Sequence, residues 1–232
     1  MKKMSMDKVL ERVEKMRALR DEYLSHVEDC HVKLQGGNSK TGKGSFTVSL
    51  VPILDCQNCA HCMGECYDVR NDCRFTNVIK DRAKNSAIHK ADPVRFWREI
   101  DEEITRTGCT FLRGNVGGDY TYDDMIDLSI VAIKHPECKF LFFTKNYDDL
   151  NKYLDEFEAF PKNVACLVSR WHDMPCENRH NMPESHVLYS DGTTTAPEFG
   201  SYLCTGDCTA CNLGGYGCPH LKRGEHVTFL NH

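Results

Sequence analysis

The chain has 232 residues, is 41% hydrophobic and 27% charged, and carries a formal net charge of −5 at pH 7. This length is enough to bury a hydrophobic core, and we expect a single domain over residues 1–232. The acidic balance disfavours a broadly basic surface for nucleic acid. No apolar run approaches the roughly 18 residues that a membrane-spanning helix needs, so we expect no membrane partner.

The first third of the chain combines helical periodicity with one apolar strand pattern. Hydrophobic residues recur at helical spacing over residues 7–28, which predicts an N-terminal helix within residues 1–30. Residues 46–54 form an apolar run that predicts a strand. Helices are expected over residues 75–88 and after Asp92, which is followed by Pro93 in the arrangement typical of a helix start.

Strand and helix patterns then alternate. Apolar runs at 109–113, 139–144 and 164–169 predict strands, a fourth is expected near 186–189, and helices are expected over 121–134 and 148–160. Thr121 and Asp124 form a capping-box pattern at the first of these helices. Such alternation is typical of a parallel sheet with right-handed connections. We therefore predict an α/β fold with a curled, mostly parallel sheet similar to a partial β/α barrel. Its core spans residues 44–200, and a cysteine-rich segment follows at 201–232.

Fourteen cysteines are the most informative feature of the sequence, because eight of them fall into two tight groups. The first group is Cys56, Cys59, Cys62 and Cys66, and the second is Cys204, Cys208, Cys211 and Cys218. Cysteines two or three residues apart can converge on one metal centre from a short loop. We expect one or two [4Fe–4S] clusters in these metal-binding loops, with zinc as the alternative.

Disulfides are the less favoured explanation for the cysteines. Residues 1–28 contain no apolar segment typical of a secretory signal, so the expected compartment is the reducing cytoplasm. The cysteines outside the two groups are expected to be mostly small buried side chains; they are Cys30, Cys73, Cys109, Cys138, Cys166 and Cys176. The ligand assignment within the groups stays open. Cys66 could serve the second group and Cys218 the first, as in two-cluster ferredoxins.

Polar residues follow the predicted strands, at the edge where α/β proteins bind ligands. We expect Asp119, Lys145 and Arg170 to be catalytic, and Gly117, Gly118, Asn146 and Ser169 to bind a cofactor. The alternative is that these residues cap helices and turn the chain. The basic, glycine-rich segment 36–42 either holds phosphates or forms a flexible turn.

Several motifs in order resemble the gene-product-88 family of phage proteins. They are GGNSKTGKGSFTVSL, CMGECYDV, LRGNVGGDY, KFLFFTKN and LVSRW. The resemblance implies a phage or prophage origin, a location in the host cytoplasm, and metal bound by cysteines.

A second resemblance is to radical S-adenosylmethionine enzymes, which hold a [4Fe–4S] cluster after the first strand of a partial barrel. It depends on Cys62-x₃-Cys66-Tyr67, on the Gly-Gly-Asp after one strand and on the Thr-Lys-Asn after the next. The C-x₃-C-x₂-C spacing of those enzymes is absent from the first group. We expect an iron–sulfur protein with redox or radical-type chemistry at a strand-end pocket, with a small molecule or redox partner and with S-adenosylmethionine as a candidate cofactor. The alternative is a binding module whose cysteine groups are structural zinc or iron–sulfur staples, and the oligomeric state is left open.

Overall fold

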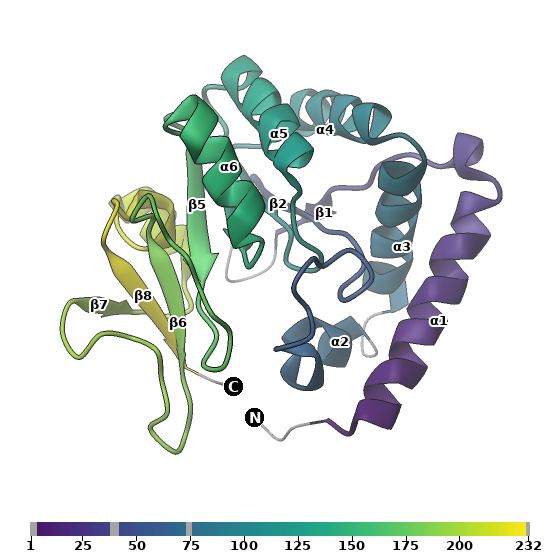
Figure 1. The fold of residues 1–232 in the computed structure, drawn as a ribbon. Coiled ribbons are helices and arrows are strands. Elements are labelled where there is room, and N and C mark those ends of the chain that lie inside the picture. Colours follow the sequence, from purple (N-terminus) through teal and green to yellow (C-terminus); the bar gives the residue numbers. More distant parts are fainter. Residues whose placement is uncertain (1–3, 38–41, 73–75, 231–232) are drawn as a thin grey trace.

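The computed structural model describes residues 4–37, 42–72 and 76–230, which form one sheet of eight strands in the order β1-β2-β3-β4-β5-β6-β8-β7 (Figure 1). The strands are β1 (Gln35–Gly36), β2 (Ser45–Val48), β3 (Phe111–Gly114), β4 (Lys139–Thr144), β5 (Val164–Ser169), β6 (Glu184–Leu188), β7 (Ser201–Leu203) and β8 (His226–Leu230). Neighbouring strands are parallel except for β1 and β2, which are antiparallel. The predicted α/β class and mostly parallel sheet are confirmed; the sheet does not close into a barrel.

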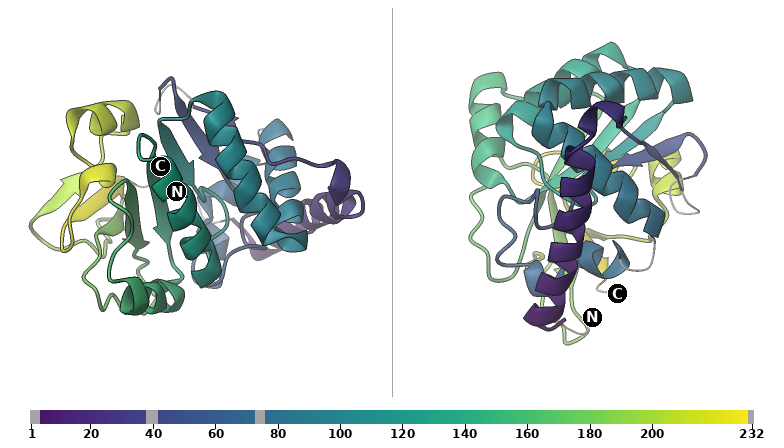
Figure 2. Two further views of the ribbon diagram at one scale, coloured as in Figure 1. Left: turned by 90° about the horizontal axis from the view of Figure 1, so that it is seen from above. Right: turned by 90° about the vertical axis from the view of Figure 1, so that its right-hand side faces the viewer.

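Seven α-helices pack around this sheet in the described ranges. They are α1 (Met6–Leu24), α2 (Tyr67–Asp72), α3 (Thr76–Ala91), α4 (Pro93–Thr107), α5 (Tyr122–Lys134), α6 (Tyr147–Phe157) and α7 (Cys208–Gly214), with 3₁₀ turns η1 (Val27–Asp29), η2 (Met63–Glu65) and η3 (Cys218–His220). The predicted N-terminal helix is α1, which packs along α3 on the side of the molecule remote from β7 (Figures 1 and 2). No helix in the described ranges has both the length and the apolar character to cross a membrane.

Alternation along β4 explains why its sequence is almost wholly apolar. Phe140 and Phe142 belong to the large core that α4, α5 and α6 share with the sheet, whereas Leu141 belongs to a separate cluster with Leu167 and Val227. Successive side chains of a strand point to opposite faces. The sheet is therefore packed on both faces, with helices on the outer one and the chain's own C-terminal segment on the inner one.

The predicted helix starts are confirmed in their chemistry. Asp92 accepts a hydrogen bond from the backbone N–H of Arg95 at 2.9 Å, with Pro93 at the first helical position of α4. At the start of α5, Thr121 and Asp124 form the reciprocal capping box that their spacing predicts. These caps satisfy N–H groups that a helix cannot pair internally.

Several boundaries differ from the sequence prediction. The strand expected over 46–54 is shorter in the structure and ends at Val48; residues 52–55 form a turn in which Ile53 takes a positive φ of 71°. Glu158, with a φ of 63°, ends α6 at Phe157 rather than at 160. Strands β1, β7 and β8 were not predicted. Strand β8 lies between β6 and β7, so the C-terminal cysteine-rich segment completes the sheet. Cys73 and the middle of the glycine-rich segment, residues 38–41, lie outside the described residues.

Candidate functional site

A cavity of about 360 Å³ opens where the parallel strands end, on the inner side of the sheet. Its lining includes all four cysteines of the first group, together with Gly117, Gly118, Asp119, Lys145 and Ser169. Residues from the loops after β2, β3, β4 and β5 thus meet at one site. This is the edge of an α/β sheet at which ligands bind.

The cysteines of this loop lie in a poorly solvated environment. Burial raises the pKa of Cys56 well above its usual value, and the nearby Asp119 carboxylate raises it further. Burial, followed by the charge of Asp68, raises the pKa of Cys66 to about 12. Burial and Cys62 also raise the pKa of Cys59. These thiols stay protonated at neutral pH unless a cation compensates their charge, and a metal that binds them must displace protons.

Hydrogen bonds fix the cysteine loop to its neighbours. Asp55, directly before Cys56, accepts from Ser86 Oγ at 2.6 Å and from the backbone N–H of Val51 at 2.7 Å. The side-chain amide of Asn58 donates to the backbone carbonyl of Lys145 at 2.8 Å. The first cysteine group is therefore held against both the helix layer and the end of β4.

Gly117 and Gly118 are required by the close approach of two loops. A Cβ on Gly117 would lie 3.0 Å from the Leu50 carbonyl oxygen, and one on Gly118 would lie 2.8 Å from Leu50 Cβ. Gly118 also has a φ of +86°, which side chains other than glycine rarely adopt. The glycines thus bring the loop after β3 against the segment that leads into the cysteines.

Asp119 borders the cavity, yet its carboxylate is used within the protein. Oδ2 accepts from the backbone N–H of Lys145 at 2.8 Å, and Oδ1 accepts from that of Tyr120 at 2.9 Å. Burial raises the pKa of Asp119 to about 6, although hydrogen bonds from Thr144 and Lys145 oppose that rise. The Asp119 carboxylate therefore connects the loop after β3 to the loop after β4.

The other candidates separate into two sets. Lys145 lines the cavity with its Nζ 5.4 Å above the Trp171 ring, and Ser169 lines it while its carbonyl accepts from Tyr147 Oη at 2.6 Å. Asn146 is buried and binds the Tyr120 carbonyl at 3.0 Å, outside the lining. Arg170 also lies outside the lining, where its Nε is 3.8 Å from Glu184 Oε2.

Unpaired donors in the cavity wall are a feature that the sequence did not predict. Among the described residues, Arg113 Nε, Asn115 Nδ2 and Trp171 Nε1 are buried without a hydrogen-bond partner, and all three residues line the cavity. A buried donor without an acceptor costs about 1–3 kcal/mol. The only signal in the sequence was their position: Arg113 is the last residue of the predicted strand 109–113, and Asn115 and Trp171 follow predicted strands.

The second cysteine group lines a smaller cavity of about 40 Å³. Arg113, Phe143 and Phe229 border both cavities and so form a wall between them. Cys66 lies with its own group and Cys218 with the second, so the structure does not bring together the residues of the cross-ligation alternative.

The outlying cysteines fit their expected role where the structure describes them. Cys30, Cys109, Cys138 and Cys166 are buried, and Cys176 is half-buried. They line neither of the two cysteine cavities.

Fold and site together define an α/β protein with a cysteine-lined cavity at the carboxyl ends of its parallel strands. The family model described as Gene product 88 matches residues 29–223, well over half of the chain. The chain therefore belongs to the gene product 88 family, the family of phage proteins that its motifs resemble. No curated protein and no solved structure matches it.

Proposed function

We propose that the first cysteine group holds a [4Fe–4S] cluster and that the adjoining cavity binds a small molecule for redox or radical-type chemistry. The observation that carries this proposal is that the cysteines and a set of residues with unpaired N–H groups line the same cavity. Four cysteines and three residues with unpaired N–H groups, Arg113, Asn115 and Trp171, line the same 360 Å³ cavity. A cluster bound there would supply single electrons.

The all-cysteine donor set of the first group is typical of an iron–sulfur centre. A single zinc ion with Zn–S bonds of about 2.3 Å would bring its thiolates to roughly 3.8 Å from one another. Among the described residues, no three cysteine ligand atoms of either group lie within 4.8 Å of one another, so binding one zinc ion would require the thiols of either group to move together. All-cysteine ligation at short spacings is typical of iron–sulfur clusters, and this favours iron over zinc at the first group.

The unpaired donors indicate the class of small molecule. The unpaired N–H groups of Arg113, Asn115 and Trp171 are buried in the cavity wall, and Lys145 adds a positive charge beside the Trp171 ring. Carboxylates and phosphates are the ligands that satisfy such a set, because charge-assisted hydrogen bonds are the strong ones. S-adenosylmethionine carries a carboxylate and is the first candidate, provided that three rather than four cysteines hold the cluster.

The second cysteine group supports a structural role. Its cavity of about 40 Å³ leaves room for little beyond a bound metal centre, and Cys204 and Cys218 pack against the inner-face cluster that contains Leu141 and Leu167. Burial raises the pKa of Cys218 to about 12, and Cys204 adds to the rise. We assign this group as a zinc or iron–sulfur staple for the C-terminal segment. If both groups are staples, the protein is a binding module instead.

We further propose that the protein acts in the cytoplasm of the host cell, where reducing conditions keep clustered cysteines available for metal. A redox partner that delivers electrons to the first cluster would meet it there.

Tryptophan fluorescence and electron paramagnetic resonance together test the ligand part of this proposal. The chain contains two tryptophans, Trp97 in the helix-covered core and Trp171 in the cavity wall. S-adenosylmethionine should change the fluorescence of the anaerobic protein saturably and shift the resonance signal of the reduced cluster. In Trp171→Phe the fluorescence response should vanish because the fluorophore is lost. Binding should weaken at unchanged iron content, because the indole N–H and part of the ring are removed while the cysteines are untouched. An iron-loaded protein indifferent to the cofactor in both measurements would exclude S-adenosylmethionine and leave electron transfer.

A further inference from the structure

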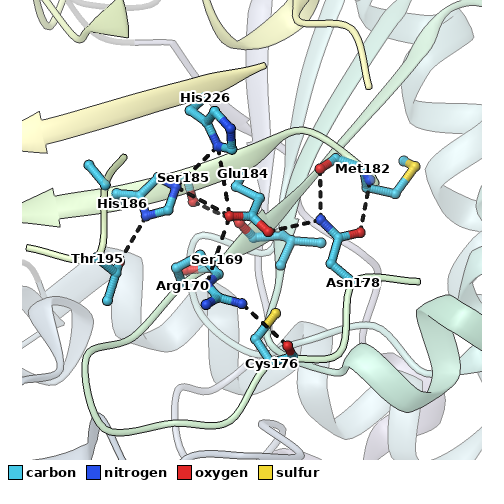
Figure 3. Close-up of polar contacts among 12 residues, drawn as sticks. Ser169, Arg170, Cys176, Asn178, Met182, Glu184, Ser185, His186, Thr195 and His226 are labelled. Carbon is cyan, nitrogen blue, oxygen red and sulfur yellow. Dashed lines mark hydrogen bonds and ion pairs between the residues drawn. The ribbon is translucent and has the colours of Figure 1, made fainter. Parts of the chain in front are cut away.

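A second candidate site lies on the part of the sheet formed by β6 and β8, and uses no cysteine. Glu184 and His186 are two residues apart on β6, so their side chains leave the same face of the strand. His226 on β8 is the register partner of Glu184. Figure 3 shows the carboxylate and the two imidazoles directed toward one another.

The three side chains point away from the inner-face cluster. Val227, the residue after His226, pairs with Ser185 and belongs to that cluster. Since side chains alternate along a strand, His226, Glu184 and His186 project from the opposite face. His186 also belongs to the lining of the larger cavity, whereas Glu184 and His226 line neither cysteine cavity. The group contains no cysteine and is a site separate from both cysteine groups.

The ligand atoms are spaced as a small metal ion requires. His186 Nε2 lies 3.3 Å from Glu184 Oε2 and 3.3 Å from His226 Nδ1, and His226 Nδ1 lies 3.7 Å from the same carboxylate oxygen. A tetrahedral ion with bonds of about 2.0–2.2 Å separates its ligands by roughly 3.4 Å. Among the described residues, this is the group of three or more possible ligands whose atoms all lie within 4.8 Å.

Neighbouring groups hold two of the three ligands in a binding orientation. Thr195 Oγ1 lies 2.8 Å from His186 Nδ1, and Asn178 Nδ2 donates to Glu184 Oε1 at 2.9 Å (Figure 3). These contacts use His186 Nδ1 and Glu184 Oε1. The other nitrogen and the other oxygen, His186 Nε2 and Glu184 Oε2, remain for a cation. Outer contacts of this kind orient metal ligands in known sites.

We propose that Glu184, His186 and His226 bind a divalent transition-metal ion, with zinc the best fit. Two imidazoles and one carboxylate form a ligand set that zinc accepts in tetrahedral sites. Three protein ligands leave the fourth position for water, as in catalytic rather than structural zinc sites. The ion would join β6 to β8 where each strand begins.

Arg170 is the charged group that opposes this cation. Its Nε lies 3.8 Å from Glu184 Oε2, while its Nη1 is held by the Cys176 carbonyl at 3.3 Å (Figure 3). The guanidinium charge competes with a bound metal for the carboxylate. Arg170→Gln should therefore tighten zinc binding, whereas it would have no such effect if the three residues formed only an ion-pair network with Arg170.

Zinc titration of the full chain tests the proposal. Metal bound by the cysteine groups contributes equally to the wild type and to each variant, so it cancels in the comparison. The wild-type protein should bind one more zinc ion per chain than Glu184→Gln and His226→Gln, and zinc should raise its melting temperature more. His172→Gln is the matched control, since His172 lies outside the group and should leave the zinc content unchanged. Equal zinc content in wild type, Glu184→Gln and His226→Gln, each folded by circular dichroism, would overturn the proposal.

Cobalt supplies a second readout that separates this site from the thiolates. The difference spectrum between cobalt-loaded wild type and His226→Gln should show the intense visible bands of tetrahedral Co²⁺ without a sulfur-to-cobalt charge-transfer band. A difference spectrum dominated by sulfur charge transfer would assign the lost ion to cysteines and refute the site.

Discussion

The ring of Phe143 on β4 meets the ring of Phe229 on β8 edge to face, with centroids 5.9 Å apart. Two strands, β5 and β6, lie between β4 and β8 in the sheet. Such contact requires the sheet to curl around its inner face. The two rings, with the Arg113 guanidinium 5.6 Å from the Phe143 ring, divide the concave side into the two cysteine-lined cavities. The two cysteine groups should therefore behave as separate sites.

Single cysteine substitutions test this separation. Cys59→Ser should remove the metal of the first site and Cys208→Ser that of the second, each lowering total metal content by one site's share. Both changes should lower solubility, because site formation is coupled to folding. Elemental analysis of the purified variants gives the result.

Cys138→Ser is the control for these variants. Cys138 is buried with its Sγ 3.8 Å from Cys109 Sγ, and it lines neither cavity. The metal content of the Cys138→Ser protein should therefore equal that of the wild type. If the single substitution Cys59→Ser removed the metal of both sites, the second group would depend on the first for metal binding.

Gly118→Ala should destabilise the protein more than Gly192→Ala. Both glycines have nearly the same positive φ, +86° and +84°, so both variants pay a backbone strain of about 1–3 kcal/mol. Only at Gly118 would the new Cβ meet another atom, Leu50 Cβ at 2.8 Å, while nothing lies within 4 Å at Gly192. Urea unfolding should show the larger loss for Gly118→Ala. Equal losses would mean that the two loops separate easily.

A buried ion pair in the helix layer predicts a pH-dependent stability. His89 Nε2 lies 2.7 Å from Asp124 Oδ1. Burial lowers the pKa of His89, but the hydrogen bond to Asp124 and its charge outweigh burial and raise it above 6.5. Burial likewise raises the pKa of Asp124, but the hydrogen bond from His89 brings it below 3.8. The raised pKa of His89 stabilises the fold below about pH 6.5, and this stabilisation is lost as the pH rises through the folded-state value.

The His89→Gln variant isolates that contribution. The difference in unfolding free energy between wild type and His89→Gln should be largest between about pH 4 and 6.5 and should shrink toward pH 8 and toward pH 3. His26→Gln, at an exposed position, should show no such profile. A constant difference across this range would mean that His89 stays neutral in the folded protein.

Where local chemistry decides the structure, the sequence was sufficient. The boundaries of β4 and β5 match the apolar runs 139–144 and 164–169, and the caps at Asp92 and Thr121 formed as their spacing predicts. The convergence of the first cysteine group with Gly117 to Asp119 and Lys145 followed from the rule for strand ends.

Contacts between segments far apart in the chain were beyond the sequence. Strand β8 is short, with five residues, and its place between β6 and β7 depends on pairing with Glu184–Leu188. Arg113 and Trp171 have unpaired donors because the neighbouring segments bury these groups without offering an acceptor, and the sequence does not show which segments those are. His226 meets His186 only because β8 pairs with β6.

The iron and acid-labile sulfide content of anaerobically purified protein, with its visible spectrum, tests the central claim most directly. The first cysteine group should give about four irons per chain, or about eight if the second group also holds a cluster, with broad absorption near roughly 400 nm. Cys59→Ser should lose about four of these irons and Cys138→Ser none. A colourless, iron-free protein whose zinc content falls in Cys59→Ser would contradict the account, because the first group would then be a zinc site.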